Sequence, residues 1–265
     1  MAILTQDDHT AGRDIYGDHE AAWKKLRFTD PDNPTDPKPA DKLYNFIDGD
    51  SENSQLGSGT DRDDVYRGGH GNDNFFGRKG DDHLFGQNET DDLSGEAGND
   101  HIYGGDSRDI IDGGEGDDNL WGDAGSDVLS GDQGKDTLWG GDEADHLTGG
   151  DGPDHLQGED DEDWLDGSAG DDFLFGGNGR DTHTGGPGND QHAAGDGSDL
   201  FSFEPTGHGH DRIIDFEPGI DRIAVRAVAD SAVRYTDDGL GSTRVTWGDP
   251  ETDIVLVGVE ASQFT

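Results

Sequence analysis

The chain has 265 residues, and its 62 acidic residues against 18 basic ones give a formal net charge of −44. Only 28% of the residues are apolar, so we expect the metal-free chain to be disordered, as chains of low hydrophobicity and high charge are. This charge makes nucleic acids and anionic membranes poor partners unless cations bridge them. The absence of cysteine excludes disulfides, and no apolar run is long enough for a membrane span.

Residues 1–58 form the first of three predicted segments. They contain a predicted short helix near Asp18–Phe28, a stretch with four prolines and a brief apolar patch at 43–47. This content is too small for an independent enzyme domain, so we expect an irregular segment. The first residues show no basic stretch followed by an apolar one, so we expect no cleaved secretory signal.

Residues 59–202 repeat a nine-residue unit, G-G-x-G-x-D-x-U-x with U a large apolar residue, sixteen times without insertion. Position 1 is glycine in fifteen units, and position 8 is apolar in fourteen. Position 6 is always aspartate, and the sixteen residues are Asp64, Asp73, Asp82, Asp91, Asp100, Asp109, Asp118, Asp127, Asp136, Asp145, Asp154, Asp163, Asp172, Asp181, Asp190 and Asp199.

Each unit predicts one turn and one short strand. Glycine permits the positive φ angles of a tight turn, and the middle residue of x-U-x points to the opposite side from its two neighbours. One apolar side chain per unit cannot bury itself, so successive units must stack, with two strands per coil around a shared core. The sequence therefore predicts an all-β fold, a parallel β-roll whose turns form two columns.

Each column of turns carries aspartate carboxylates and backbone carbonyls at the ~4.8 Å spacing of neighbouring strands. Hard oxygen ligands in such number suit Ca²⁺, which takes about six to eight of them. We therefore predict Ca²⁺ as the cofactor and the sixteen position-6 aspartates as its ligands.

Two runs, GGHGNDNF at Gly68–Phe75 and GGEGDDNL at Gly113–Leu120, resemble the repeats of the repeats-in-toxin (RTX) family of haemolysin-type calcium-binding proteins. The resemblance covers slightly more than half of the chain. It implies a right-handed parallel β-roll with Ca²⁺ between stacked turns. It also implies export by type I secretion machinery that reads an uncleaved C-terminal signal, and hence an extracellular location.

Residues 203–265 leave the nine-residue period and are predicted to form a β cap that contains the secretion signal. We expect strands at 212–216, 221–225, 243–247 and 253–259. The runs 201–203, 211–216 and 219–223 resemble the segment that closes the rolls of serralysin-type proteases and alginate-epimerase R-modules. A solenoid needs such a cap over its open end.

Odd and even units lie on opposite flanks, and their sequences predict two unequal columns of turns. Position 4 is glycine in every odd unit from the third to the fifteenth, but four even units carry Glu89, Ser107, Glu143 or Asp161 there. A Cβ disfavours the positive φ of this position, so we expect six well-formed calcium sites on the odd column and weaker or vacant sites on the even one. The alternative is that the acidic replacements supply ligands themselves.

Position 9 of the odd units predicts a row of aromatic side chains on the outer face of one sheet. The row consists of Phe85, Tyr103, Trp121, Trp139 and Phe175, and Gln157 interrupts it. An exposed apolar stripe usually marks an interface. Either residues 1–58 or another copy of the chain covers this row, or the row stacks on the sugar rings of an extracellular polysaccharide.

The sequence contains no H-E-x-x-H, G-x-S-x-G or Walker A motif and no cysteine nucleophile. We therefore predict a secreted calcium-binding β-roll protein that is not an enzyme, that folds on Ca²⁺ outside the cell and whose partners are calcium ions and the type I secretion machinery. The alternatives are an extracellular polysaccharide-binding or adhesive module, and a fragment or accessory of an exported enzyme.

Overall fold

The computed structural model describes residues 45–51, 56–226, 233–237, 239–247 and 253–264. The chain divides into two compact units, Met1–Lys42 and Leu43–Thr265, and all described residues belong to the second. The helix predicted near residues 18–28 lies outside the described residues.

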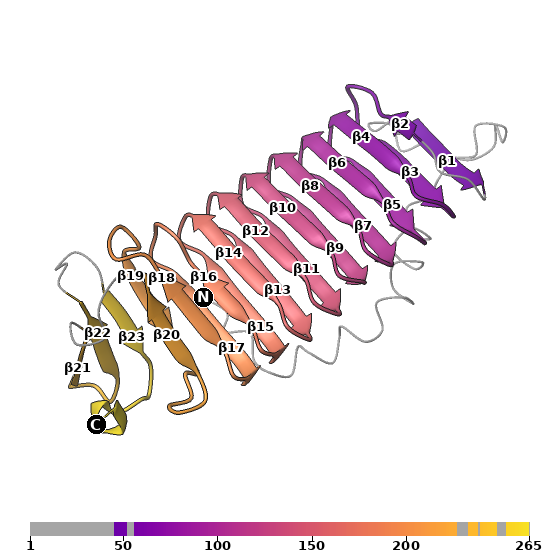
Figure 1. Ribbon diagram of the computed structural model, residues 1–265. Coiled ribbons are helices and arrows are strands. Elements are labelled where there is room, and N and C mark those ends of the chain that lie inside the picture. The colour runs from indigo at the N-terminus through magenta and orange to yellow at the C-terminus, as the bar shows by residue number, and fades with distance from the viewer. Residues whose placement is uncertain (1–44, 52–55, 227–232, 238, 248–252, 265) are drawn as a thin grey trace. The chain divides into compact units, whose positions relative to one another are not determined.

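The second unit is a parallel β-roll, in which the chain alternates between two sheets (Figure 1). The thirteen strands of the first sheet are, in spatial order, β1 (Asn45–Ser51), β3 (Asp64–Gly69), β5 (His83–Gln87), β7 (His101–Asp106), β9 (Asn119–Ala124), β11 (Thr137–Asp142), β13 (His155–Asp160), β15 (Phe173–Gly179), β17 (Gln191–Gly197), β19 (His210–Ile213), β23 (Asp253–Leu256), β22 (Thr243–Thr246) and β21 (Arg234–Asp237). The ten strands of the second are β2 (Leu56–Ser58), β4 (Asn74–Lys79), β6 (Asp92–Ala97), β8 (Ile110–Glu115), β10 (Val128–Gln133), β12 (His146–Asp151), β14 (Trp164–Ala169), β16 (Thr182–Thr184), β18 (Leu200–Phe203) and β20 (Arg222–Val225). A short 3-10 helix, η3 (Ala261–Phe264), follows.

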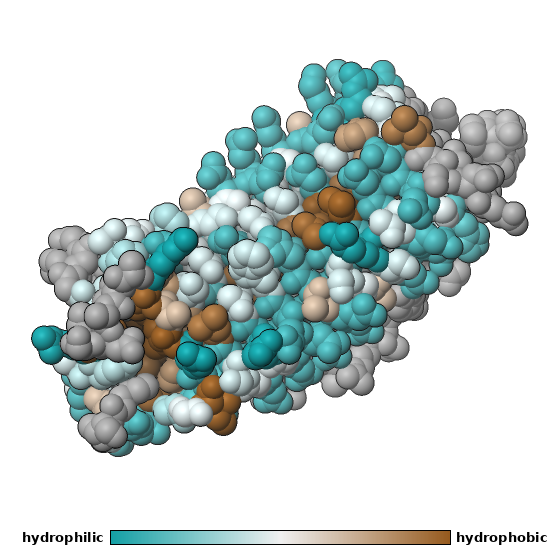
Figure 2. Space-filling view, viewed as in Figure 1, coloured by the Kyte–Doolittle hydropathy of each residue, from teal (hydrophilic) through white to brown (hydrophobic). Residues whose placement is uncertain are grey.

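The strand register follows the nine-residue repeat. Leu120 of β9 pairs with Leu138 of β11, and Leu129 of β10 pairs with Leu147 of β12, so every coil places the same repeat position in the same row. The predicted β-roll is therefore confirmed. On the face shown in Figure 2 most of the surface is hydrophilic, as the acidic composition leads one to expect.

The core of the roll consists of the position-8 side chains. One buried cluster runs from Tyr66 to Leu174 and takes one residue from each of thirteen successive units. His183 and His192 hold the next two core positions, where both rings are fully buried with their centroids 5.8 Å apart. A second cluster, which includes Phe201, begins beyond them and fills the C-terminal coils.

The coils extend past both ends of the nonapeptides. β1 pairs with β3 and β2 with β4 at the N-terminal end, and β19 and β20 pair with β17 and β18 at the other. The four strands predicted after residue 203 are present as β19, β20, β22 and β23 with shifted ends, while β21 is an addition to them. β21, β22 and β23 pair antiparallel and end the first sheet.

Candidate metal sites

The position-6 aspartates form a hydrogen-bonded ladder along each flank of the roll. All sixteen are buried. The backbone N–H of each donates to Oδ1 of the corresponding aspartate in the next coil, as from Asp100 to Asp118 at 2.7 Å and from Asp109 to Asp127 at 2.7 Å. One carboxylate oxygen of each residue after the first two is therefore used to hold adjacent coils in register.

The second carboxylate oxygen has no such role. In the fourteen position-6 aspartates from Asp82 to Asp199, Oδ2 is buried without a hydrogen-bond partner. Burial raises the pKa of Asp100 and Asp118 to about 7, and it raises the pKa of Asp109 and Asp145 to about 9. A buried carboxylate of this kind is costly unless a cation or a donor reaches it.

Glycine at position 1 makes room for this oxygen. A Cβ at Gly77 would overlap Oδ2 of Asp82 and would lie 2.7 Å from the carbonyl oxygen of Gly95 in the next coil. Gly86 is enclosed in the same way on the other flank, by Asp91 and Gly104. We call each such arrangement of one aspartate and its neighbouring carbonyls a cradle.

The cradle chemistry fits a hard cation. Within the described residues no group of three or more His, Cys, Asp or Glu side chains is placed to hold a metal, and the buried donors of each cradle are one carboxylate and the neighbouring backbone carbonyls. Ca²⁺ takes ligands of this mixture, and it tolerates irregular geometry.

The family model for the RTX calcium-binding nonapeptide repeat matches seven overlapping segments that together cover residues 58–201 without a gap: 58–91, 85–120, 113–147, 121–156, 148–183, 157–191 and 174–201. That range is more than half of the chain. The chain belongs to the RTX calcium-binding repeat family. Its repeats therefore bind Ca²⁺, as the donor set of the cradles requires.

Among solved structures, the chain is similar to the extracellular lipase LipA from Serratia marcescens, with 19% identity and a TM-score of 0.37. The match covers 63% of this chain and only 39% of the lipase, and a likeness at that level does not extend the lipase's activity to this chain. No curated protein matches. In the part of the chain that the structure describes, no helix is long and apolar enough to cross a membrane.

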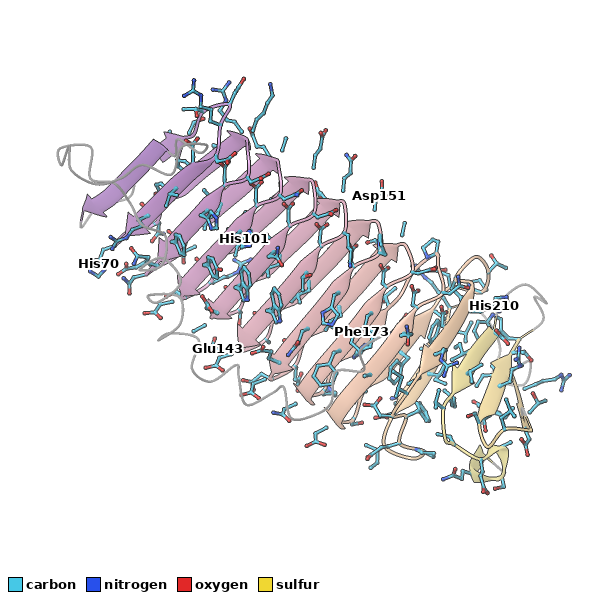
Figure 3. All side chains as sticks on the ribbon, turned by 180° about the vertical axis from the view of Figure 1, so that it is seen from behind. His70, His101, Glu143, Asp151, Phe173 and His210 are labelled. Atoms are coloured by element: carbon cyan, nitrogen blue, oxygen red, sulfur yellow. The ribbon has the colours of Figure 1, made fainter. Side chains whose placement is uncertain are left out.

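The two RTX columns differ in their turns, as their sequences predict. On the odd column the position-4 N–H donates to the position-3 carbonyl of the next coil in six consecutive gaps, at 2.7–3.0 Å. The first of these bonds joins Gly80 N–H to the carbonyl of Ala97, and the last joins Gly170 N–H to that of Pro187. The position-4 residues Glu89, Ser107, Glu143 and Asp161 of the even column donate no such bond within the described residues. Figure 3 places Asp151, from an odd turn, and Glu143, from an even turn, on opposite flanks.

The backbone angles give the reason for this difference. The six position-4 glycines of the odd column from Gly80 to Gly170 have φ between 115° at Gly80 and 157° at Gly170, which side chains rarely adopt. Glu89, Ser107, Glu143 and Asp161 instead have φ of 66–79°, in the left-handed helical region. The even turns therefore have a different shape at these four places, and each carries the strain of a non-glycine residue at positive φ.

The aromatic row lies outside the cluster of position-8 side chains, on the face predicted for it, with Phe85 buried and the other four side chains half-buried. Ring centroids are 4.9 Å apart for Phe85–Tyr103, 4.3 Å for Tyr103–Trp121 and 4.6 Å for Trp121–Trp139, with interplanar angles of 2–7°. Each inner ring is thus covered on both faces by its neighbours. Figure 3 shows His101 and Phe173 on the same sheet face. We call the four stacked rings the aromatic ladder; Phe175 lies beyond it, after Gln157.

The structure adds two aspartates that the repeat count missed. Asp190 donates its N–H to Asp211 Oδ1 at 3.0 Å, and Asp199 donates its N–H to Asp221 Oδ1 at 3.1 Å, so the hydrogen-bonded row of aspartates continues into the cap. These steps span 21 and 22 residues instead of 18. The signal was present as G-H-G-H-D at 207–211, but a three-residue insertion moved it out of the period.

Proposed function

We propose that the protein is a secreted, non-catalytic β-roll that folds when Ca²⁺ enters its cradles. The fourteen buried Oδ2 atoms without a partner carry this proposal. An unsatisfied buried polar group costs about 1–3 kcal/mol, and charged groups cost more. Fourteen such groups outweigh the net stability of about 5–15 kcal/mol that a folded domain has, so the roll needs cations at neutral pH.

A calcium titration followed by circular dichroism tests this proposal. In excess EGTA the chain should be disordered, and it should become β-rich as Ca²⁺ rises, with a midpoint of about 10⁻⁴–10⁻³ M, as in extracellular modules. Magnesium at the same concentration serves as the control, because it demands near-octahedral geometry and dehydrates reluctantly. A fully β-rich spectrum in EGTA would refute calcium-dependent folding.

We further propose that the position-6 aspartates are the calcium ligands and that the odd column is the stronger one. Six gaps between regular odd turns, from Asp82 to Asp190, offer six equivalent cradles. Even-column sites next to Glu89, Ser107, Glu143 and Asp161 would be weaker or vacant, since their turns have another shape. Equal calcium occupancy along both flanks in a crystal structure would contradict this assignment.

Secretion is part of the same proposal. Membership of the RTX family and the low cytosolic Ca²⁺ concentration support a chain that stays unfolded inside the cell and folds outside. We propose residues 1–58 as an N-terminal segment, 59–202 as the calcium-binding part and 203–265 as a cap with the export signal. Deleting residues 203–265 should retain the protein in the cell, while a deletion of residues 1–42 should not. Undiminished export of the C-terminal truncation would refute this placement.

The polysaccharide alternative is not favoured by the aromatic ladder. Sugar rings stack on exposed faces of aromatic rings, but the faces of Tyr103 and Trp121 are covered by their neighbours. The aromatic ladder is better suited to stabilising the contact between successive coils of the roll, because cross-strand aromatic pairs stabilise a sheet. The absence of a catalytic motif in the sequence supports a non-enzymatic role, and no feature of the roll favours an enzyme fragment over it.

A further inference from the structure

The first turn of the roll and its last two turns differ from the inner ones in the contacts of the second carboxylate oxygen. In the inner turns Oδ2 has no hydrogen-bond partner. In the first turn Asp64 Oδ2 accepts bonds from Thr60 N–H at 2.5 Å and Thr60 Oγ1 at 3.2 Å. In the last turn of the even column Asp221 Oδ2 accepts the N–H of Glu217 at 2.7 Å. The chain's own donors thus take the place that is left open elsewhere.

The last turn of the odd column uses a histidine. Asp211 Oδ1 continues the ladder by accepting the N–H of Asp190, as its counterparts do. Its Oδ2, however, lies 2.6 Å from Nδ1 of His208. When the Asp211 carboxylate is ionised it can only accept, and Nδ1 of His208 is then the donor. Both side chains are buried, with 3% of His208 and none of Asp211 exposed.

The imidazole of His208 is held in place by the cap. Its ring lies 5.0 Å from the ring of Trp247 at an interplanar angle of 29°, and 5.4 Å from that of Phe203. Trp247 is itself fixed by a hydrogen bond from Nε1 to the carbonyl of Pro205 at 2.9 Å. Packing on these rings aims Nδ1 at the carboxylate, so the contact does not depend on a mobile surface side chain.

We propose that His208 is an internal substitute for calcium, which occupies the metal position of the Asp211 turn and ends the odd column of sites. On this proposal the N–H of His208 lies on the side of Oδ2 where a cation at about 2.3–2.6 Å would lie in an inner turn, so the two exclude each other. Thr60 and the backbone of Glu217 close the first turn and the last even turn in the same manner. This inference rests on the proposed function, because it presumes that the inner cradles hold Ca²⁺.

The repeats themselves suggest the variant that tests this assignment. His208 stands at position 3 of its turn, where two of the regular odd turns carry alanine, Ala97 and Ala169. His208→Ala therefore gives this turn the position-3 residue of a regular turn and releases Oδ2, while Thr206 stays at position 1. We expect one additional Ca²⁺ per chain, measured as bound metal after equilibrium dialysis in excess calcium. His208→Asn, which keeps an N–H donor near the Nδ1 position, should bind the same number as the unchanged protein.

Gln133→Ala is the matched control, because it makes the same position-3 change in a regular odd turn and should leave the calcium number unaltered. Tryptophan fluorescence reports whether the packing around Trp247 survives. An unchanged calcium number in a folded His208→Ala variant would overturn the proposal, and so would an extra ion in His208→Asn.

A crystal structure of the unchanged protein with calcium decides the matter even if the alanine variant does not fold. We expect ions at the inner aspartates, such as Asp172, and none at Asp211. An ion bound to Asp211 Oδ2, with His208 displaced, would refute the proposal that His208 replaces calcium there and would leave the proposed function standing. Absence of ions from every turn would instead refute the proposed function.

Discussion

Replacing Asp118 by asparagine should weaken calcium-driven folding far more than the same change at Asp145. The two residues are closely matched in burial and in backbone hydrogen bonds. Both are nearly fully buried, their Oδ1 atoms each accept a backbone N–H at 2.7 Å, and their own N–H groups donate at 2.8 and 2.9 Å. They differ in the turn that precedes them, which has Gly116 at φ 138° for Asp118 and Glu143 at φ 76° for Asp145.

The size of the effect follows from the loss of one charged ligand. An interaction with a charged group contributes about 1.5–3 kcal/mol, and each 1.4 kcal/mol changes an equilibrium constant about tenfold. Asp118→Asn should therefore weaken calcium binding at its site about ten- to one-hundred-fold. If the Asp145 site is weak or vacant, its carboxylate contributes little to calcium binding. Asp145→Asn should then change calcium binding less than about threefold, which corresponds to less than about 0.7 kcal/mol.

Calcium titration by circular dichroism, together with a count of bound Ca²⁺, measures both variants. Asp151→Asn is the control, because it removes the same unit of charge from an exposed position-3 side chain in an odd turn. It should shift neither the midpoint nor the count. Equal losses at Asp118 and Asp145 would refute the argument that turn shape sets the strength of a site.

The pH dependence of folding should follow from the buried carboxyls. Burial raises the pKa of Asp100 from the ordinary 3.8 to about 7, and it raises the pKa of Asp145 from 3.8 to about 9. Carboxyls whose pKa is higher in the folded than in the unfolded state stabilise the metal-free fold below pH ~4, and this stabilisation is lost as the pH rises through 7–9. Protons should therefore compete with calcium for these carboxyls. The calcium midpoint of folding should rise as the pH falls from 8 to 6. A midpoint that does not change with pH would contradict this. Changing Trp121 and Trp139 together to alanine removes the Trp121–Trp139 and Tyr103–Trp121 stacks and should cost about 1–3 kcal/mol of stability in calcium, at about 0.5–1.5 kcal/mol per pair. Urea unfolding in calcium measures this cost, and Ser130→Ala on the other sheet is the control. Complete loss of calcium-induced folding would contradict the interpretation that the aromatic ladder only stabilises the folded roll.

Much of this protein can be read from the period of its sequence. A nine-residue unit with one apolar residue has only one way to bury it, so the repeat alone predicted the parallel roll and the core row through Leu120 and Leu138. The same period placed Asp118 and its counterparts in columns and separated odd from even turns. These inferences succeeded because, in a strict repeat, the position of a residue within its unit also determines which residues lie beside it in the neighbouring coils.

Only the tertiary structure decided what happens where the period fails. Asp211 and Asp221 rejoin the ladder after loops of irregular length, because sheet pairing depends on strand register and tolerates longer turns at the edge of the roll. The contact of His208 with Asp211 depends on packing against Trp247, a residue 39 positions away in the sequence, which no local pattern encodes. Face-to-face stacking of the aromatic ladder likewise depends on side-chain rotamers, so the sequence could place Trp121 and Trp139 side by side but could not determine whether their ring faces were open.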